Sequence, residues 1–537
     1  MSTHPRNKRP WSTKSPDGPW DYIVIGSGMG GMTTAAFLAK LGRRVLVLEQ
    51  HYVPGGFTHM FSRKGYTWDV GVHAVGEVTP HSLTGRLLRE LTDDKLRWAS
   101  LGEVCDAFHW PDGFRIDYPD TPSQYRENLV AAFPDEADAI DSYLHIVREV
   151  AGAMKGYYLA RTASPRLAPV ADRLLGRRAQ RYLDMSTADV VSELTDNPKL
   201  RAVLVSQWGY YGSPPSRSSF AIQALVVKHF LWGGYYPEGG ASEIALHLLQ
   251  TVANAGGWTR INADVERIVI EKERATGVVL SSGEEIAARR VISAAGVMST
   301  VERLLPETYR EQAWSAGIRK LEPAAAHVCL YLGFKGDIRE AGASAANRWF
   351  YETWEMEGQV WDVHPDQEDL PRAACLYCSF PSLKDPRHDP GPEQRHTGEV
   401  VTFVPWKTFA PWKDDRWRNR GQEYADFKHR LERQLLDQLL EQMPGLKGML
   451  DFVELSTPVS TDHFVRPIEG SIYGIEPTPE RFNNPWLRPK SPIRGLYFSG
   501  SEVATVGVVG AMMGGVLASV AAEPIGALRF LRSTRMR

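Results

Sequence analysis

A glycine turn between a short apolar run and a helix constrains the fold of this chain more than any other feature. Residues 21–31 read DYIVIGSGMGG, which places Gly26, Gly28 and Gly31 at the spacing Gly-x-Gly-x-x-Gly. This spacing predicts a strand, a tight turn and a helix over residues 32–41. The first glycine allows the turn, the second lets a pyrophosphate approach the backbone, and the third lets the helix pack closely on the sheet. The pattern is typical of a unit that holds a dinucleotide at the helix N-terminus.

An acid ends the next apolar run. Residues 43–49 read RRVLVLE, and Glu49 follows the glycines at the distance, about 20 residues, where a carboxylate accepts the hydroxyls of an adenosine ribose. A ribose 2′-phosphate would be repelled there, which argues against NADP as the tightly held nucleotide. The motif alone leaves the identity of the dinucleotide open.

Length and charge exclude several classes of protein. A chain of 537 residues is too long to fold around one simple hydrophobic core, so two domains are expected. Lys and Arg number 62 against 64 Asp and Glu, and the resulting net charge of −2 gives no global attraction to nucleic acid. We therefore expect a small-molecule partner and no nucleic acid.

Cysteine usage predicts a reduced, cytoplasmic setting. Four cysteines are too few and too scattered for a disulfide framework in a chain of this length. Cys375 and Cys378 have the CxxC spacing of a redox or metal site, but they lie in the apolar run AACLYCSF with no second pair beside them. We interpret them as core cysteines and expect no metal site.

No part of the sequence predicts a membrane span. Residues 1–20 are polar, basic and proline-rich, which predicts a disordered segment and no signal peptide. No stretch reaches the ~20 apolar residues that cross a bilayer. The longest candidate, residues 507–522, is short and rich in glycine, as suits a buried helix.

Three separated stretches predict one discontinuous nucleotide domain. Residues 21–76 carry the first motif, residues 236–297 predict a helix and several strands, and residues 494–537 predict a strand and a small-residue helix. Residues 77–235 and 298–493 then form a second domain for substrate binding. Its short apolar runs and the long helix expected over 422–442 predict an antiparallel sheet with helices on it.

Taken together, these segments resemble the flavin-dependent amine oxidase and phytoene desaturase superfamily, and within it the branch of all-trans-retinol saturases and carotenoid isomerases. The resemblance covers nearly the whole chain after Asp21. It implies an α/β, two-domain FAD-binding fold of the glutathione-reductase-like Rossmann type with an inserted α+β substrate domain. The motifs that carry it are IGSGMGG, VLVLEQHYVPGGFTHMF, GYTWDVGVHAVGE, GYYGSPPS, YYPEGGASEI, PWKTFAPW, EYADFKHRLERQLLDQLLEQMPGL, GSIYGIEPTPERF and LYFSGSEVATVGVVGAMMGG.

The resemblance also implies which residues hold FAD. Many relatives carry Arg after the pair Gly55 and Gly56, whereas this chain has Phe57 and Thr58, so an Arg contact to the cofactor is not expected. The implied FAD-binding residues are Gly26, Gly28, Met29, Gly30, Gly31, Glu49, Gln50, Gly55, Gly56, Phe57, Thr58, Val265, Gly500, Ser501, Glu502, Gly507, Val508, Val509, Gly510, Ala511 and Met512.

For the chemistry, the resemblance implies hydride transfer through the flavin to a C=C bond of an apolar isoprenoid polyene, as in a saturase. A positioned acid or base would assist if a carbon is protonated. His73 is the first candidate, although a His at such a position more often has a structural role; Tyr210, Tyr211 and Glu77 follow. A transiently bound NAD(P)H is a candidate reductant, because no second glycine fingerprint predicts a permanent site for it.

Other functions remain open at this point. Desaturation and cis-trans isomerisation use the same parts, an amine-oxidising flavoenzyme would require an aromatic cage and a Lys near the flavin, and a lipid carrier can share the fold without a flavin. Residues 155–181 mix Arg and Lys with apolar residues and hold one acid. This predicts helices near 150–185 that are either solvated or lie on the inner face of a membrane. The oligomeric state is open.

Overall fold

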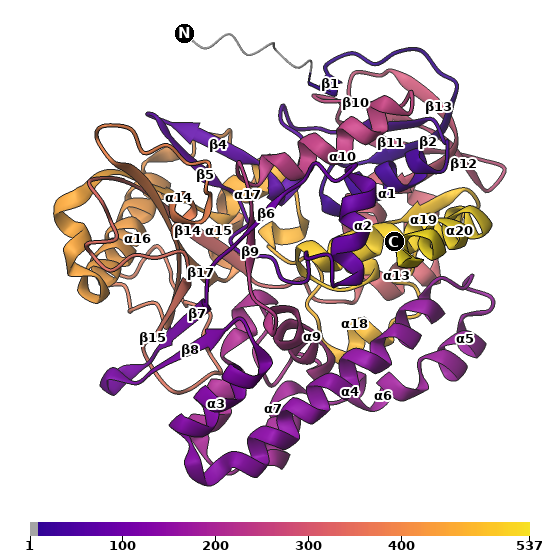
Figure 1. Cartoon of the computed structure of the whole chain (residues 1–537). Helices are drawn as coiled ribbons and strands as arrows, with labels where there is room; N and C mark the ends of the chain where they lie inside the picture. The colour runs from indigo at the N-terminus through magenta and orange to yellow at the C-terminus, as the bar shows by residue number, and fades with distance from the viewer. Residues whose placement is uncertain (1–8, 537) are drawn as a thin grey trace.

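The computed structural model describes residues 9–536, which form two domains around two large sheets (Figure 1). The first sheet has eight strands in the order β1-β10-β3-β2-β13-β12-β11, with β19 also paired to β13. The pairs from β1 to β13, and β13 with β19, are parallel, while β13, β12 and β11 form an antiparallel meander. Its strands are β1 (Trp11–Ser12), β2 (Trp20–Ile25), β3 (Val45–Leu48), β10 (Trp258–Arg260), β11 (Val265–Glu271), β12 (Arg274–Leu280), β13 (Glu285–Ser293) and β19 (Leu496–Phe498).

Both faces of this parallel sheet are covered, which explains why its strands read as continuous apolar runs. In β2, Tyr22 and Val24 pack toward α1 (Met29–Lys40), α10 (Ser242–Asn254) and α19 (Gly507–Ala522). Ile23 and Ile25 pack on the opposite face against β11 and β12. The expected helix over 507–522 is confirmed as α19, and α1 begins three residues before the expected residue 32.

The expectation of disorder over residues 1–20 is wrong for the residues that the structure describes, and residues 1–8 lie outside them. Trp11 and Ser12 pair in parallel with Thr259 and Arg260 and form the edge strand β1. Farther along this segment, the Arg44 guanidinium donates hydrogen bonds to the carbonyls of residues 17 and 19 and lies 4.5 Å from the centre of the Trp20 ring. These long-range contacts order a segment whose polar composition favours disorder.

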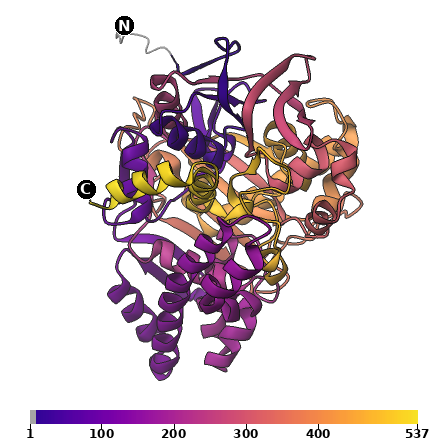
Figure 2. The ribbon, with the colours of Figure 1, turned by 90° about the vertical axis from the view of Figure 1, so that its right-hand side faces the viewer.

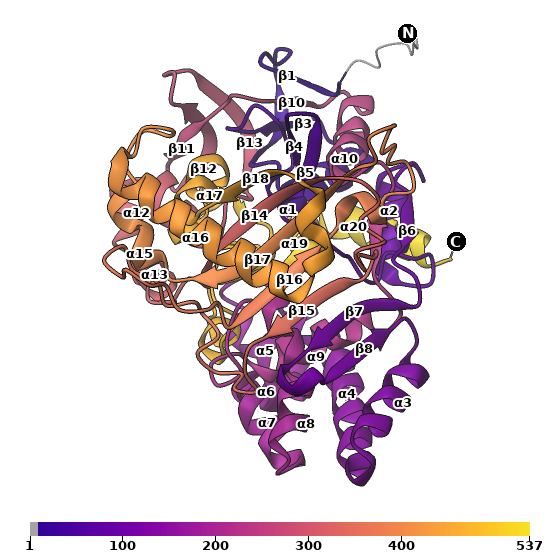
Figure 3. The ribbon, with the colours of Figure 1, turned by 90° about the vertical axis from the view of Figure 1, so that its left-hand side faces the viewer.

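The second sheet has seven strands in the order β18-β14-β17-β16-β15-β7-β8, and every pair except β15 with β7 is antiparallel. α16 (Gly421–Gln442), expected over 422–442, packs across one face (Figure 3). Alternate residues of β14 explain the packing, because Val328 and Leu330 lie under α16 whereas Cys329 and Tyr331 face the other side. The strands are β7 (Val104–His109), β8 (Arg115–Pro119), β14 (Ala326–Lys335), β15 (Asn347–Tyr351), β16 (Cys375–Ser379), β17 (Arg395–Val404) and β18 (Leu450–Ser456).

A helical layer projects from the second domain and forms the lower part of the molecule in Figure 2. Its long helix α4 packs against α9, α5 and α6. None of the helices within residues 9–536 is long and apolar enough to cross a bilayer. The layer consists of α3 (Pro122–Ala132), α4 (Ala137–Arg161), α5 (Ala168–Leu175), α6 (Arg177–Asp184), α7 (Thr187–Leu194), α8 (Pro198–Leu204) and α9 (Phe220–Phe230).

Shorter elements connect these layers. They are β4 (Met60–Arg63), β5 (Tyr66–Asp69), α2 (Leu83–Leu91), β6 (Trp98–Ser100), β9 (Tyr235–Pro237), α11 (Val297–Ser299), α12 (Glu307–Arg310), α13 (Ala313–Arg319), α14 (Pro381–Lys384), α15 (Trp406–Phe409), α17 (Pro458–Val465), α18 (Pro479–Asn483) and α20 (Pro524–Met536).

Candidate active site

A cavity of about 1010 Å³ runs between the two domains. It begins near the end of β3 and the start of β11, passes the N-termini of α1 and α19, and ends against α4 and α9. Ligands of open parallel sheets bind at the carboxyl ends of the strands. The cavity occupies that place in the first sheet.

The three glycines of the first motif have three different surroundings. Gly26 has φ +90°, which favours glycine, and its N–H donates a 2.8 Å hydrogen bond to the Leu48 carbonyl. A Cβ at Gly31 would lie 2.1 Å from the Gly26 carbonyl oxygen, so α1 packs on the turn only because the position is glycine. A Cβ at Gly28 would meet nothing within 4 Å and would project into the cavity.

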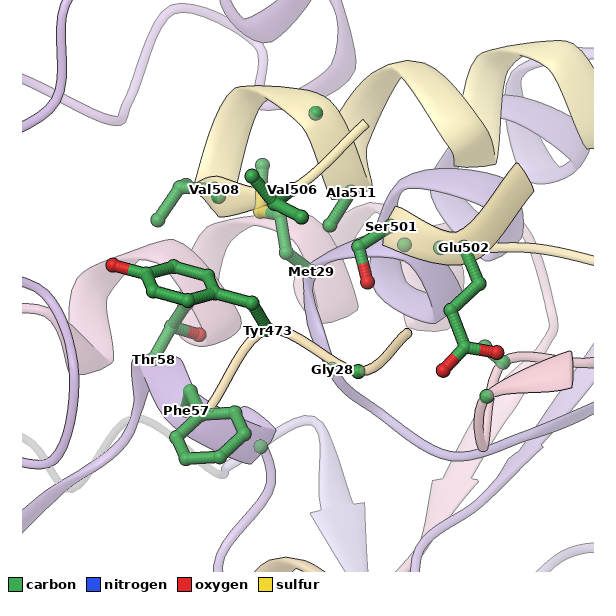
Figure 4. Close-up of a pocket in the computed structure, with 18 of the residues that line it drawn as sticks. Gly28, Met29, Phe57, Thr58, Tyr473, Ser501, Glu502, Val506, Val508 and Ala511 are labelled. Atoms are coloured by element: carbon green, nitrogen blue, oxygen red, sulfur yellow. The ribbon is translucent and has the colours of Figure 1, made fainter. Parts of the chain in front are cut away.

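Two helix N-termini meet the cavity without a side-chain cap. Neither α1 nor α19 has a capping hydrogen bond or an acid in its first turn. The first N–H groups of an α-helix have no partner within the helix. These two ends therefore offer N–H donors and positive dipole ends to an anion. Figure 4 shows the start of α19, with Val508 and Ala511, above Gly28 and Met29.

Glu49 lines the cavity and anchors the turn. Its Oε2 accepts hydrogen bonds from the Ser27 N–H at 2.9 Å and the Ser27 hydroxyl at 2.6 Å, and its Oε1 accepts one from the His51 N–H at 2.8 Å. A carboxylate offers about four lone-pair positions. Three are used within the protein, so Glu49 retains room for about one ribose hydroxyl rather than the pair expected from the sequence.

Most of the residues implied by the resemblance line this cavity. Those that do so are Gly26, Gly28, Met29, Gly30, Glu49, Gln50, Gly56, Phe57, Thr58, Val265, Gly500, Ser501, Glu502, Gly507, Val508, Val509, Gly510 and Ala511.

Gly31, Gly55 and Met512 do not line it. Gly31 packs on the turn, and Gly55 lies behind the wall, where its N–H donates a 3.0 Å hydrogen bond to the Ser27 hydroxyl. Met512 is fully buried among side chains of the first domain, whereas Met513 lines the cavity. The expectation for Met512 is wrong because the rotation of α19 turns this side chain toward the core.

Glu502 joins two of the separated stretches. Its Oε2 accepts hydrogen bonds from the N–H groups of Val297 and Met298 at 2.5 and 3.1 Å. Burial raises the pKa of Glu502 above its ordinary value. Ser501 and Glu502 come just before α19 in the sequence, and Figure 4 shows them near Gly28. The acid thus holds the loop after β13 against the cavity wall.

Three of the four acid-base candidates reach the cavity. His73, Tyr210 and Glu77 line it, whereas Tyr211 is fully buried and donates a 2.9 Å hydrogen bond to Gln223 Oε1. Tyr211 is therefore a core residue, and its assignment to the active site is wrong. The two adjacent tyrosines point apart because they end a 3₁₀ turn, Ser206–Tyr210, that only tertiary packing orients.

Glu77 and Tyr210, two of these three cavity residues, have different neighbours. Glu77 forms an ion pair with Lys228, and its Oε2 lies 3.6 Å from the Nδ1 of His229, whose Nε2 accepts a 2.7 Å hydrogen bond from the Gly76 N–H. Tyr210 donates a 2.6 Å hydrogen bond to the buried Asp106. Burial and the Asp106 charge raise the pKa of Tyr210 well above its ordinary value, so Tyr210 stays protonated.

Sequence reasoning missed three residues here. Tyr473 lines the cavity beside Thr58 (Figure 4) and lies in the quoted run GSIYGIEPTPERF. Glu399 and Lys384 are almost fully buried behind His73. A charge inside the apolar run EVVTFVPW was the signal that could have revealed Glu399, because buried carboxylates are rare unless they are paired or functional.

The hydrogen-bonding groups that line the cavity fit FAD. An open backbone at Gly28, two uncapped helix ends and an anchored carboxylate are the groups that a diphosphate and a ribose require. Gly500 and Gly507 also leave their Cβ positions open, beside the turn that carries Ser501 and Glu502. Isoalloxazine chemistry, when FAD is bound there, is hydride transfer.

The similarity of this chain to known proteins is consistent with a flavin site of this geometry. The model of the flavin containing amine oxidoreductase family matches residues 29–522. All-trans-retinol 13,14-reductase of Danio rerio is 33% identical over 517 residues, covering 92% of this chain and 84% of that protein. Prolycopene isomerase 1 of an Oncidium hybrid cultivar is 26% identical over 518 residues, covering 92% and 83%.

The fold likeness extends further. Cyclohexylamine oxidase from Brevibacterium oxydans IH-35A superposes with a TM-score of 0.60 at 16% identity and covers 96% of this chain and all of that one. At an identity this low, the similarity shows a shared fold and nothing more. The chain belongs to the flavin containing amine oxidoreductase family, in the branch that holds the retinol 13,14-reductases and prolycopene isomerases.

Proposed function

We propose that this protein is an FAD-dependent oxidoreductase that reduces a C=C bond of an apolar isoprenoid polyene, as a saturase does. The observation that carries the proposal is the composition of the far end of the cavity. Seven of the ten side chains that α4 and α9 contribute to it are aliphatic or aromatic, Met154, Ile222, Leu225, Val226 and Phe230 among them; the other three are Lys155, Lys228 and His229. Such a wall suits a hydrocarbon chain and excludes water from the reacting bond.

An amine substrate fits this end of the cavity less well. A cationic amine would require a free acid or an aromatic cage. Glu77 is the acid that lines the cavity here, between His73 and Lys228, and it is already paired with Lys228 and His229. The wall therefore favours a neutral substrate.

A lipid carrier of the same fold would not need the diphosphate cradle. The open backbone at Gly28 and the uncapped start of α19 support a bound flavin instead. A yellow purified protein with a flavin absorption band is expected. Colourless protein that cannot be reconstituted with FAD would favour the carrier.

The direction of the reaction is tested with two polyenes that appear in the names of the relatives. The protein is incubated under anaerobic conditions with all-trans-retinol and with prolycopene, once with reduced and once with oxidised flavin, and the products are analysed by mass and absorption. We expect a gain of two hydrogens and a shortened conjugated system. A loss of hydrogens would identify a desaturase, and an unchanged mass with altered geometry an isomerase; either would overturn the saturase assignment. NADH and NADPH are compared as transient reductants of the flavin.

We further propose that the protein is cytoplasmic and docks reversibly on the inner face of a membrane through α5 and the end of α4. Five large apolar side chains are exposed in this short region, Leu159, Leu167, Val170, Leu174 and Leu175. Scattered single apolar residues need no explanation, but a cluster of this kind marks an interaction surface. We call these five residues the α4–α5 patch.

Charge around the α4–α5 patch supports an anionic lipid surface as the partner. Six basic residues of the region 155–181 are exposed, Lys155, Arg166, Arg173, Arg177, Arg178 and Arg181. The single acid, Asp172, forms a 2.9 Å ion pair with the buried Arg488. The unbalanced charge is thus positive, as required for attraction to anionic headgroups.

The position of α4 connects the patch with the cavity. Ala151, Met154, Lys155 and Tyr158 of α4 line the cavity, and Leu159 of the same helix belongs to the α4–α5 patch. A polyene dissolved in a bilayer would therefore meet the protein one helical turn from the cavity wall. This proximity supports uptake of substrate from the membrane.

A further inference from the structure

A buried polar cluster lies behind the cavity wall beside His73. Glu399 of β17, Lys384 of α14 and Asp69 of β5 are all less than 4% exposed. Burying charged groups is costly, so buried acids and bases are usually paired or functional. Neither Glu399 nor Lys384 lines the cavity, but His73 does.

His73 and Glu399 approach each other closely. The His73 Nδ1 and the Glu399 Oε2 are 2.9 Å apart. The contact is poorly aligned for a hydrogen bond, and neither atom has another partner within residues 9–536. Such misalignment is common in active sites without substrate. The other oxygen of the carboxyl group, Oε1, accepts a 2.9 Å hydrogen bond from the Asp69 N–H, which leaves Oε2 as the position for a proton.

The orientation of the imidazole follows from this contact. With Nδ1 turned toward Glu399, Nε2 lies on the opposite side of the ring, and 14% of the His73 side chain is exposed, at the cavity. A neutral imidazole carries a proton on one nitrogen and a lone pair on the other. If Glu399 holds a proton and directs it at Nδ1, then Nε2 carries the N–H that points to the cavity.

The protonation states agree with this arrangement. Burial, opposed by the positive charge of Lys384, raises the pKa of Glu399 to about 8. Burial and the Lys384 charge lower the pKa of His73 to about 3. At neutral pH Glu399 therefore keeps its proton, and His73 is a neutral imidazole with one N–H.

We propose that Glu399 and His73 form a proton relay that delivers a proton to a carbon of the bound polyene. This step rests on the proposed function. The π bond of the substrate breaks, a hydride from the reduced flavin forms one new C–H bond, and the His73 Nε2 proton forms the other. The Glu399 proton moves to Nδ1 in the same step. His73 is thus neutral before and after the reaction, and Glu399 ends as a carboxylate.

Lys384 stabilises that carboxylate. Its Nζ donates hydrogen bonds to the His73 carbonyl at 2.7 Å, Asn347 Oδ1 at 2.5 Å and Ser379 Oγ at 2.7 Å. Three donated bonds are those of an ammonium group. The positive charge offsets part of the cost of a buried anion. The other titratable groups around the relay come from five strands. They are Asp69, Asp106, Tyr236, His327, Cys329, Tyr331 and Tyr377.

The first test measures the stored proton without turnover. Infrared spectra of the flavin-loaded, substrate-free protein at pH 7 are compared between the wild type and Glu399→Gln. We expect the wild type to show a protonated carboxyl band that the variant lacks. Asp69→Asn assigns the band, because burial and the Glu399 charge raise the pKa of this adjacent carboxyl group to about 7. A band that disappears in Asp69→Asn but persists in Glu399→Gln would belong to Asp69 and would overturn the relay. A Glu399 that is ionised at pH 7 would have no proton to deliver, and the relay would be overturned.

The second test measures transfer. The flavin is reduced anaerobically, all-trans-retinol is added, and the rate of flavin reoxidation is followed in one turnover. The amide introduced by Glu399→Gln would keep the shape and a donor toward Nδ1 but could not release a proton, so we expect this variant to be slower by about 100-fold or more. Flavin reoxidation in the His73→Asn variant should be slower by a similar factor. The double variant should be no slower than either single variant, because both residues act in one step.

The outcomes distinguish the relay from the proposed function. Additive losses in the double variant, or a Glu399→Gln rate equal to that of the wild type, would reduce both residues to structural roles. A wild-type protein that leaves retinol and prolycopene unchanged would refute the proposed function and the delivery step, whereas the infrared result would still report whether Glu399 holds a proton.

Discussion

Removing the apolar side chains of the α4–α5 patch tests membrane docking most directly. The triple variant Leu167→Ser, Val170→Ser, Leu174→Ser changes side chains that are 62%, 60% and 74% exposed. Because these side chains make few contacts within the protein, folding and flavin content should be unchanged. Binding to a bilayer should be weakened.

The size of the effect follows from the exposed fractions. Burial of a whole Val or Leu side chain contributes about 1.5–3 kcal/mol. With roughly two-thirds of each side chain still available, the three contribute about 1 kcal/mol each at the lower limit, or about 3 kcal/mol together. Since 1.4 kcal/mol corresponds to a factor of ten, the triple variant should bind vesicles roughly 100-fold more weakly.

The assay is co-sedimentation with vesicles of phosphatidylcholine containing phosphatidylglycerol. Ile525→Ser with Leu528→Ser, on α20, is the matched control, because these two side chains are also exposed, at 68% and 47%, but lie outside the patch. Binding by the wild type should weaken at high salt, which screens the basic residues around the patch.

Two results would refute the reasoning. Wild-type protein that stays in solution with these vesicles, or a control variant that loses as much binding as the triple variant, would mean that α4 and α5 do not define a docking surface. A wild-type dimer that the triple variant dissociates, seen by size-exclusion chromatography, would identify a second copy of the chain as the partner instead.

Four other predictions concern the site and its surroundings. Glu49→Ala should weaken flavin retention, measured by the flavin-to-protein absorbance ratio, because it releases Ser27 as well as the ribose; unchanged occupancy would contradict this. Gly28→Ala should lower FAD affinity at unchanged apoprotein stability, whereas Gly31→Ala should destabilise the fold itself, because its Cβ would lie 2.1 Å from a backbone oxygen; circular dichroism melting separates the two. Tyr211→Phe leaves Gln223 Oε1 without its donor and should lower the free energy of unfolding by about 1–3 kcal/mol, seen in urea titration, with flavin content unchanged. The rate of a single turnover should fall as pH rises through about 8, because Glu399, whose pKa is raised to about 8, loses its proton there, and Lys384, whose pKa burial lowers to about 8, loses the charge that stabilises the carboxylate; a rate that increases over this range would argue against Glu399 as the donor.

The parts of the fold that the sequence predicted well are those with local causes. The glycine turn at Gly26, the buried helix α19 and the long helix α16 follow from backbone freedom and from the spacing of apolar residues. Errors arose where neighbouring side chains share a local pattern. Tyr210 and Tyr211 are adjacent aromatic residues, and one reaches the cavity while the other fills the core.

The active site shows the same division. The resemblance and the motifs indicated the cavity-lining backbone around Gly28, Gly500 and Gly507, because glycine leaves the Cβ space open at each of these positions. Glu399 and His73 are separated by more than 300 residues of sequence, and only the packing of β17 against the loop that carries His73 brings them within 2.9 Å.

The amino-acid sequence thus determined by itself that a dinucleotide fold forms and where its glycine turn lies, because these depend on φ angles and apolar periodicity within a few residues. The tertiary structure alone decided which side of α19 faces the cavity, that residues 9–20 are ordered, and which acid lies behind His73. Those facts depend on contacts between distant segments, and the burial that those contacts produce is also what shifts the pKa of Glu399.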